Sequence, residues 1–277
     1  MTTKEEVKKP ATIDVEAIFK KRNPHMYRLL PGFILSYIKR TIHQDELNMA
    51  LEKFKDLYGL DFIAEILDFF GVKYTVSGTE NIPKEGRFIF VSNHPLGGLD
   101  GMILMNLVGK YHRNLKFIVN DLLLNLKNLE PIFIPVNKHG RQSLEYARRI
   151  EEVYKSDQQI LYFPAGLCSR KQGKIITDLE WKKNFIKKAV DHNRDIVPVH
   201  FEGKNSRFFY RLANLRKALG IKANIEMFYL PDEMFSQKDQ DIHVTIGKPL
   251  QWSNFDKSKS PSAWAEEVKK VVYALPG

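Results

Sequence analysis

A histidine and an aspartate six positions apart, His94 and Asp100, are the residues of this sequence best suited to do chemistry. They lie in residues 88–101, where an apolar run typical of a buried strand leads into a loop. A histidine in such a loop can take a proton from a hydroxyl, and a carboxylate can fix its tautomer and stabilise the imidazolium. Gly97 and Gly98 are expected to let the loop fold back until Asp100 reaches His94. The alternative is that Asp100 only caps a helix and His94 bonds locally.

The elements that would position this pair follow from hydrophobic patterning. Apolar or alternating runs predict strands at residues 72–76, 87–92, 115–119, 132–136, 159–163, 195–201 and 242–246. Helices are predicted at residues 100–108, 143–154, 177–192 and 262–275, the third of them with a Thr177–Glu180 capping box. This alternation predicts an α/β fold around a mainly parallel, mixed sheet flanked by helices. Ligands of such folds bind at the carboxyl ends of strands, where His94 lies.

The first part of the chain has a different pattern. Residues 1–70 are predicted to form an N-terminal helical module that contacts the membrane, and residues 71–277 an α/β domain. Residues 44–70 read as one helical run, which Gly59 weakens. No apolar stretch is long enough to span a membrane, and the start of the chain does not resemble a secretory signal. We expect a cytoplasmic protein, peripheral at the inner face of the cell membrane.

The charge of the chain favours an anionic partner. It carries 43 Lys and Arg against 33 Asp and Glu, although a basic surface kept for solubility would give the same total. Residues 26–42 are apolar with basic flanks, which suits a helix in the headgroup region of a membrane or a helix packed on the protein's own core. Residues 204–222 are basic and aromatic, and fit an interfacial helix, a single-stranded nucleic-acid site or a core-packed helical hairpin.

A family resemblance follows from four short blocks. Residues 93–101 resemble the His-x4-Asp signature of the glycerolipid acyltransferases, the lysophosphatidic-acid acyltransferase group, but five residues separate His94 from Asp100. The sequence of residues 93–101 is more similar to that of a bacterial hemolysin-like branch, which includes O-acyltransferases that make ornithine and glycine lipids. Residues 132–138, 162–170 and 197–199 are similar to the later blocks of the family, in the same order.

The resemblance implies transfer of a fatty acyl group from acyl-ACP or acyl-CoA to the hydroxyl of a lyso-lipid, with His94 and Asp100 catalytic and no metal or other cofactor. The family carries Arg where this chain has Lys138 and Glu where it has Ala165. Both departures favour a monoacylated amino acid, such as lyso-glycine or lyso-ornithine lipid, over lysophosphatidic acid as acceptor in membrane lipid synthesis. The substrate-binding residues implied are Asn93, Gly97, Gly98, Lys138, Phe163, Pro164, Ala165, Gly166, Ser169 and Arg170.

Several reactive residues lie near these blocks. Cys168 is expected to be an inert thiol, because direct transfer needs no enzyme nucleophile. Asp178 is expected in the first turn of the helix at 177–192, where its negative charge is favourable next to the helix dipole. The alternative is that Asp178 and Trp181 pack over the site. The histidines show no metal-ligand spacing. The alternatives that stay open are a lysophosphatidic-acid acyltransferase of phospholipid synthesis and a non-catalytic protein that binds anionic lipid or nucleic acid. We expect no nucleic-acid partner.

Overall fold

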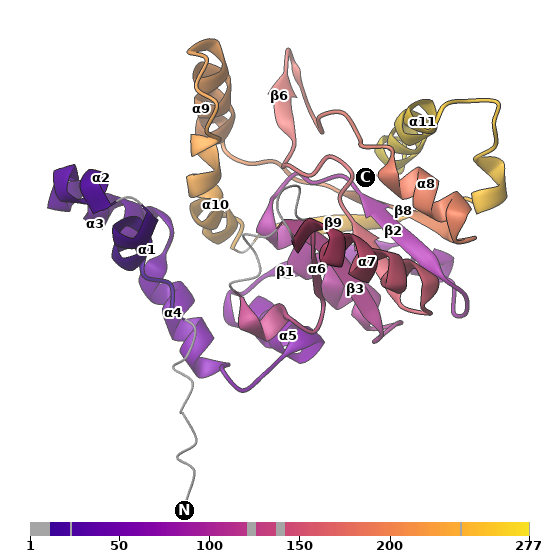
Figure 1. Ribbon diagram of the computed structural model, residues 1–277, viewed down its shortest axis with the longest axis horizontal. Helices are drawn as coiled ribbons and strands as arrows, with labels where there is room; N and C mark the ends of the chain where they lie inside the picture. The colour runs from indigo at the N-terminus through magenta and orange to yellow at the C-terminus, as the bar shows by residue number, and fades with distance from the viewer. Residues whose placement is uncertain (1–11, 23, 121–125, 137–141, 239, 277) are drawn as a thin grey trace, which may run out of the picture.

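The computed structural model describes residues 12–22, 24–120, 126–136, 142–238 and 240–276, and a seven-stranded sheet lies at the centre of this described part (Figure 1). The strand order is β1-β9-β8-β2-β5-β3-β4. The bounds are β1 (Lys73–Ser77), β2 (Phe88–Ser92), β3 (Leu115–Asn120), β4 (Phe133–Val136), β5 (Gln159–Tyr162), β8 (Asp195–Phe201) and β9 (Asp241–Ile246). Only the β8–β9 pair among these is antiparallel, so the predicted α/β fold with a mainly parallel, mixed sheet is confirmed.

The register of the central strands brings their carboxyl ends together. Val91 of β2 pairs with Tyr162 of β5 on one side and with Pro198 of β8 on the other. The loops that follow β2 and β5 therefore leave the sheet at the same edge, and these loops carry His94 and Phe163. This edge is where the fold predicts a ligand.

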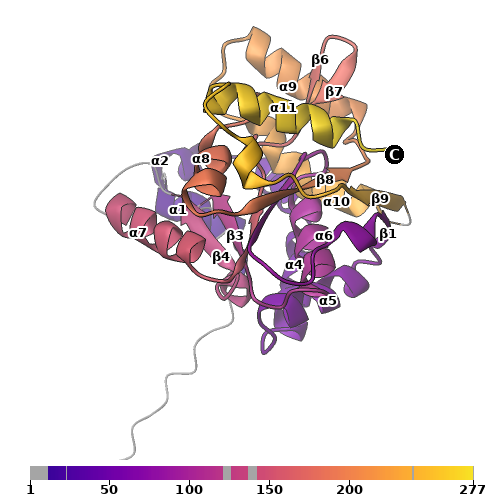
Figure 2. The same ribbon diagram turned by 90° about the vertical axis from the view of Figure 1, so that its right-hand side faces the viewer.

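Helices cover both faces of the sheet, because neighbouring residues of each strand point to opposite faces. Phe90 belongs to one buried cluster with α4 (Gln44–Lys53), α5 (Gly59–Phe69) and α6 (Gly98–Gly109). Ile89 and Val91 belong to the other, with α7 (Gln142–Lys155), α8 (Asn184–Asp191) and α11 (Pro261–Tyr273). Figure 2 shows α7 and α8 on one side of the sheet and α5 and α6 on the other.

The N-terminal part is helical, as the pattern indicated. It comprises α1 (Val15–Arg22), α2 (Pro24–Leu29), α3 (Gly32–Thr41), α4 and α5. The single run predicted over residues 44–70 is two helices, because the backbone of Gly59 has a φ of +61° at the start of α5. Phe62 and Ile63 of α5 share the core cluster of the sheet. The division into a module at 1–70 and a domain at 71–277 stays a prediction.

One predicted helix start was wrong. The Thr177–Glu180 capping box does not form, because Thr177 ends a β-hairpin of β6 (Arg170–Gln172) and β7 (Ile175–Thr177) and pairs with Arg170. A turn with Gly173 at a φ of +62° closes this hairpin. The helix that follows, α8, begins only at Asn184.

The basic segment at 204–222 forms a helix, α9, and not a helical hairpin. The remaining elements are α9 (Arg207–Ala218), α10 (Leu230–Ser236) and short 3-10 turns η1 (Thr79–Asn81), η3 (Lys127–Leu129), η4 (Ile225–Tyr229) and η5 (Trp252–Asn254). None of the helices in the described ranges has the length and apolar character needed to cross a membrane.

Candidate active site

His94 and Asp100 contact each other directly. The Nδ1 atom of His94 lies 3.0 Å from Oδ2 of Asp100. The same Oδ2 accepts the backbone N–H groups of Leu96, at 2.8 Å, and Gly97, at 3.1 Å. Asp100 is fully buried, and this burial raises the pKa of its carboxyl, whereas the His94 imidazole and the Leu96 N–H act in the opposite direction and favour the ionised form. With the carboxylate ionised, Nδ1 carries the proton and donates it, which leaves Nε2 as the basic nitrogen of the ring.

Gly97 makes this return of the loop possible. Its φ is +78°, a conformation that favours glycine, and it forms the N-cap of α6. A Cβ on Gly97 would lie 3.0 Å from Leu230 and 3.3 Å from the sulfur of Cys168. Gly98 was also expected to let the loop fold back, but it is the first residue of α6 and a Cβ there would meet nothing within 4 Å. Only Gly97 of the pair is needed for the turn.

An aromatic ring and a thiol lie against the His94 imidazole. Phe163, which follows β5, stacks on it with ring centroids 4.1 Å apart and an interplanar angle of 18°. The buried Cys168 lies beside the imidazole, and the Ser169 N–H donates to the His94 carbonyl oxygen at 2.8 Å. The side chain of His94 remains 16% exposed, so a substrate can reach it from this edge of the sheet.

The surroundings of His94 make it a stronger base than an ordinary histidine. Burial lowers the pKa of the imidazole, whereas the Cys168 sulfur and the Asp100 carboxylate raise it. The raising influences prevail, so the pKa of His94 lies above its ordinary value of 6.5. A basic nitrogen of this kind, held by a carboxylate, can remove the proton of a hydroxyl as that oxygen attacks a carbonyl carbon.

Asp178 is the residue that sequence reasoning placed wrongly. It is not in a first helical turn, and it lies fully buried behind His94. Its Oδ1 accepts the His94 N–H at 3.2 Å and the Ser169 hydroxyl at 2.5 Å, while Oδ2 accepts the Trp181 indole N–H at 2.9 Å. The carboxylate thus binds the histidine loop to the segment after β5. An acidic residue shortly after the third block was the only signal, and it was read as a helix start.

The other residues predicted to bind substrate divide into four groups. Asn93 exchanges two hydrogen bonds with the backbone of Phe201, so it ties the loop to β8. Arg170 is 7% exposed and donates to the buried Glu226 at 2.9 Å, a carboxylate that it shares with Arg216. Residues 163–166 follow β5 at the same edge as His94. Lys138 lies outside the described residues. A substrate contact stays a prediction for all of them.

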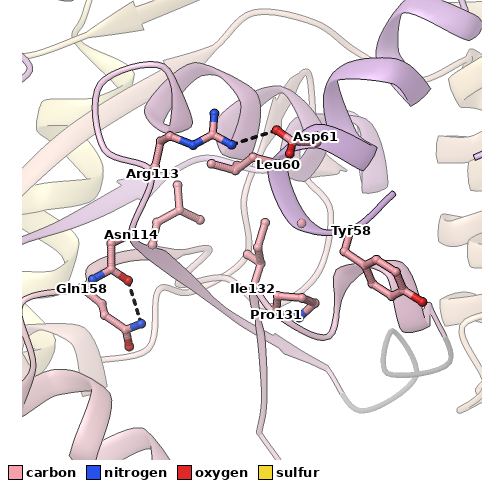
Figure 3. A pocket seen from close by; sticks show the side chains of 10 residues that line it. Tyr58, Leu60, Asp61, Arg113, Asn114, Pro131, Ile132 and Gln158 are labelled. Carbon is pink, nitrogen blue, oxygen red and sulfur yellow. Dashed lines mark hydrogen bonds and ion pairs between the residues drawn. The ribbon is translucent and has the colours of Figure 1, made fainter. Parts of the chain in front are cut away.

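A hollow on the opposite edge of the sheet is not a candidate for this chemistry. Figure 3 shows it between the start of α5 and the beginnings of β3 and β5. Its polar groups are paired with each other: Arg113 with Asp61 at 2.8 Å, and Gln158 with Asn114 at 2.9 Å. Within the described ranges, no three His, Cys, Asp or Glu side chains are grouped to hold a metal ion.

Comparison with known proteins identifies a family that covers most of the chain. A family model described as acyltransferase matches residues 17–276. Lyso-glycine lipid O-acyltransferases from Bacteroides thetaiotaomicron and Phocaeicola vulgatus are 51% and 50% identical over 264 residues. These matches cover 95% of this chain and 97% and 95% of the two relatives. Among solved structures, the 1-acyl-sn-glycerophosphate (LPA) acyltransferase PlsC from Thermotoga maritima aligns with a TM-score of 0.47 at 18% identity, covering 93% of this chain and 92% of that one.

Proposed function

The chain belongs to the acyltransferase family, and we propose that it transfers a fatty acyl group from acyl-ACP or acyl-CoA to a hydroxyl on the acyl chain of a monoacylated glycine. It is an O-acyltransferase enzyme of membrane lipid synthesis. The observation that carries the reaction is the 3.0 Å contact between His94 and the buried Asp100. The acceptor is supported by the names of relatives about half identical over nearly the full chain.

The chemical step uses His94 as general base. Its Nε2 takes the proton of the acceptor hydroxyl while the oxygen attacks the carbonyl carbon of the thioester. The tetrahedral intermediate collapses, the carbon–sulfur bond breaks, and the imidazolium returns its proton to the leaving sulfur. Asp100 holds the ring and stabilises the imidazolium, in the manner of the aspartate of a serine-hydrolase triad. No residue of the enzyme forms a covalent bond to the acyl group.

The departures from the common blocks of the family support a carboxylate-bearing acceptor. Ala165 is buried just after β5, where a glutamate would place a negative charge close to the acceptor. Without that carboxylate, the pocket lacks a group that the resemblance assigns to acceptor binding, which favours an acceptor other than lysophosphatidic acid. Lys138 remains the proposed cation for this headgroup, as a point charge suited to a single carboxylate.

We propose that the enzyme acts as a peripheral protein at the inner face of the cell membrane, where its acceptor resides. The basic, apolar segment at residues 26–42 supports this location. Further support comes from the excess of 43 basic over 33 acidic residues, which favours an anionic lipid surface.

A direct assay tests the proposal. Purified protein is supplied with acyl-ACP or acyl-CoA and either a glycine monoacylated with a hydroxy fatty acid or lysophosphatidic acid, and the products are measured by mass spectrometry. We expect diacylated glycine lipid with the wild type, none with His94→Ala, and little phosphatidic acid. Efficient formation of phosphatidic acid alone would identify a lysophosphatidic-acid acyltransferase. Transfer that survives His94→Ala would contradict the mechanism.

A further inference from the structure

Two exposed apolar patches lie on helices that are far apart in sequence. On α2 and α3, Leu29 is 71% and Phe33 73% exposed, and Tyr37 is exposed on the next turn. On α9, Phe208, Leu215 and Leu219 are each more than half exposed. Such large apolar side chains in solvent, on more than one helix, indicate a surface that binds a protein, a membrane or another ligand.

The spacing on α9 shows that these side chains share one side of the helix. Phe208, Leu212, Leu215 and Leu219 recur at intervals of four, three and four residues, the repeat of a single helical face. The opposite side of α9 is the one that packs on the protein, through the buried residues Phe209, Tyr210 and Ala213. The apolar stripe of α9 therefore has no place in the core.

Contacts through η4 and α10 join the two patches into one surface. The Phe208 ring packs edge-on against Tyr229, with centroids 4.9 Å apart, and the Tyr229 hydroxyl lies 3.0 Å from that of Tyr37 on α3. His43, at the end of α3, stacks on Phe235 of α10 at 4.0 Å. In Figure 1, α1–α3 and α9 both lie to the left of the sheet, with α10 close by. We call the surface formed by Leu29, Phe33, Tyr37, Phe208, Leu215, Leu219 and Phe228 the α3–α9 face.

The exposed charges of the segments that carry the two patches are basic, and Asp232 on the adjoining α10 pairs with His43 at 3.0 Å. Residues 17–44 and residues 203–225 each contain six lysines and arginines and no aspartate or glutamate. Lys39 pairs with Glu16, and Arg216 shares the buried Glu226 with Arg170, so this group of three keeps one net positive charge. The exposed basic side chains of the two segments include Lys21, Arg28, Arg40, Lys204, Arg207, Arg211, Lys217 and Lys222.

From this combination we propose that the α3–α9 face docks on an anionic bilayer, with α3 and α9 lying side-on in the headgroup region. Aromatic and aliphatic side chains rimmed by lysine and arginine are the composition of interfacial helices. A second copy of the chain would bring two basic faces together, which repel. Nucleic acid would need stacking side chains where α9 presents Leu215 and Leu219.

The same elements connect the face to the catalytic site. Glu226 of η4 accepts Nε of Arg216 on α9 at 2.8 Å and Nη2 of Arg170 at 2.9 Å. Arg170 directly follows Ser169, which bonds the His94 backbone. A bilayer bound by α9 would thus lie against elements that support His94. This inference rests on the proposed function, because a lipid acceptor that resides in the bilayer is the reason for the enzyme to bind there.

Flotation with lipid vesicles tests the α3–α9 face. The full-length protein is mixed with phosphatidylcholine vesicles with or without phosphatidylglycerol. The variants are Leu215→Glu/Leu219→Glu on α9, Phe33→Glu on α3, and Leu144→Glu as matched control, because Leu144 is an apolar side chain 80% exposed on α7. We expect anionic vesicles to bind the wild type and the control equally, and the α9 and α3 variants on the order of tenfold less. Arg211→Gln and Lys217→Gln should each reduce binding roughly fivefold.

Circular dichroism shows whether each variant is folded, and only folded variants are compared. Equal binding by the α9 variant and the control would overturn the proposal, as would a wild-type dimer that Leu215→Glu dissociates without changing flotation. Salt-sensitive binding to oligonucleotides that Leu215→Glu/Leu219→Glu reduces, with no flotation of the wild type, would identify nucleic acid as the occupant instead. Acyl transfer to an acceptor dispersed in detergent is measured in parallel. This assay separates the proposal of the α3–α9 face from the proposed function. Loss of flotation with transfer retained supports the face, whereas flotation of a wild type without transfer refutes the proposed function alone.

Discussion

The backbone N–H of His94 donates a 3.2 Å hydrogen bond to the carboxylate of Asp178, which lies 84 positions later in the chain. The same carboxylate accepts from Ser169 and from Trp181, so one buried group fixes the loop of the general base and the segment after β5. Asp178 touches no reacting atom in the proposed step. Its role is to position the backbone from which the His94 imidazole extends.

Removal of this carboxylate should affect both stability and rate. Asp178→Ala leaves three buried donors without an acceptor, and we expect it to lower the free energy of unfolding by about 2 to 4 kcal/mol. Asp178→Asn keeps one oxygen for His94 and Ser169 but turns an NH2 group toward the Trp181 indole. Asp178→Asn should unfold at a higher urea concentration than Asp178→Ala. Asp178→Asn should also lower kcat. The double variant Asp178→Asn/Trp181→Phe lacks the indole N–H that the NH2 group faces, so its kcat should be higher than that of Asp178→Asn, with KM nearly unchanged. If both variants fold stably and keep the wild-type kcat, Asp178 does not position His94.

Asp100→Asn should reduce kcat and also move the pH profile. Loss of the carboxylate should lower kcat by roughly a hundred- to ten-thousand-fold with a smaller change in KM. A general base acts in its neutral form, so the rate should rise with pH until the pH exceeds the pKa of His94. In the wild type that midpoint lies above 6.5, because Asp100 and Cys168 raise the pKa. Asp100→Asn removes one raising influence, so its midpoint should fall to lower pH. A midpoint that stays in place would show that another group titrates.

The two loop glycines form a matched pair for a stability measurement. Gly97→Ala forces a side chain into a φ of +78° and against Leu230, so it should lower the free energy of unfolding by about 1 to 3 kcal/mol. Gly98→Ala has open space and an ordinary φ at the start of α6, and should change stability by less than about 1 kcal/mol. Urea titrations of both variants measure the difference. Equal stability would mean that the loop does not need the Gly97 turn.

Cys168 lies beside the general base, so whether its thiol carries the acyl group can be tested directly. Direct transfer predicts that protein incubated with acyl-CoA or acyl-ACP alone shows no added acyl mass by intact-protein mass spectrometry. Cys168→Ala should lower the midpoint of the pH profile, since the sulfur raises the pKa of His94. A thioester adduct on Cys168 that disappears with the acceptor would replace direct transfer by a two-step mechanism through the thiol.

Local patterns in the sequence were enough for most of the elements. The strand runs at 87–92, 159–163 and 195–201 match β2, β5 and β8 within one residue at each end, because buried strands are short continuous apolar runs. The prediction near Thr177 was wrong because a capping-box pattern describes only local preference. There, hydrogen bonds with Arg170 across a hairpin decided the structure.

The sequence by itself determined the reacting pair, since the contact of His94 with Asp100 needs only one loop and a turn at Gly97. It also determined the α/β fold class, because alternating strand and helix periods leave few other arrangements. Only the tertiary structure placed Cys168 beside the imidazole, made Asp178 a buried support, and joined α3 to α9 through Tyr229. These relationships link residues from different elements, and they depend on which side of a strand or helix each side chain occupies after packing.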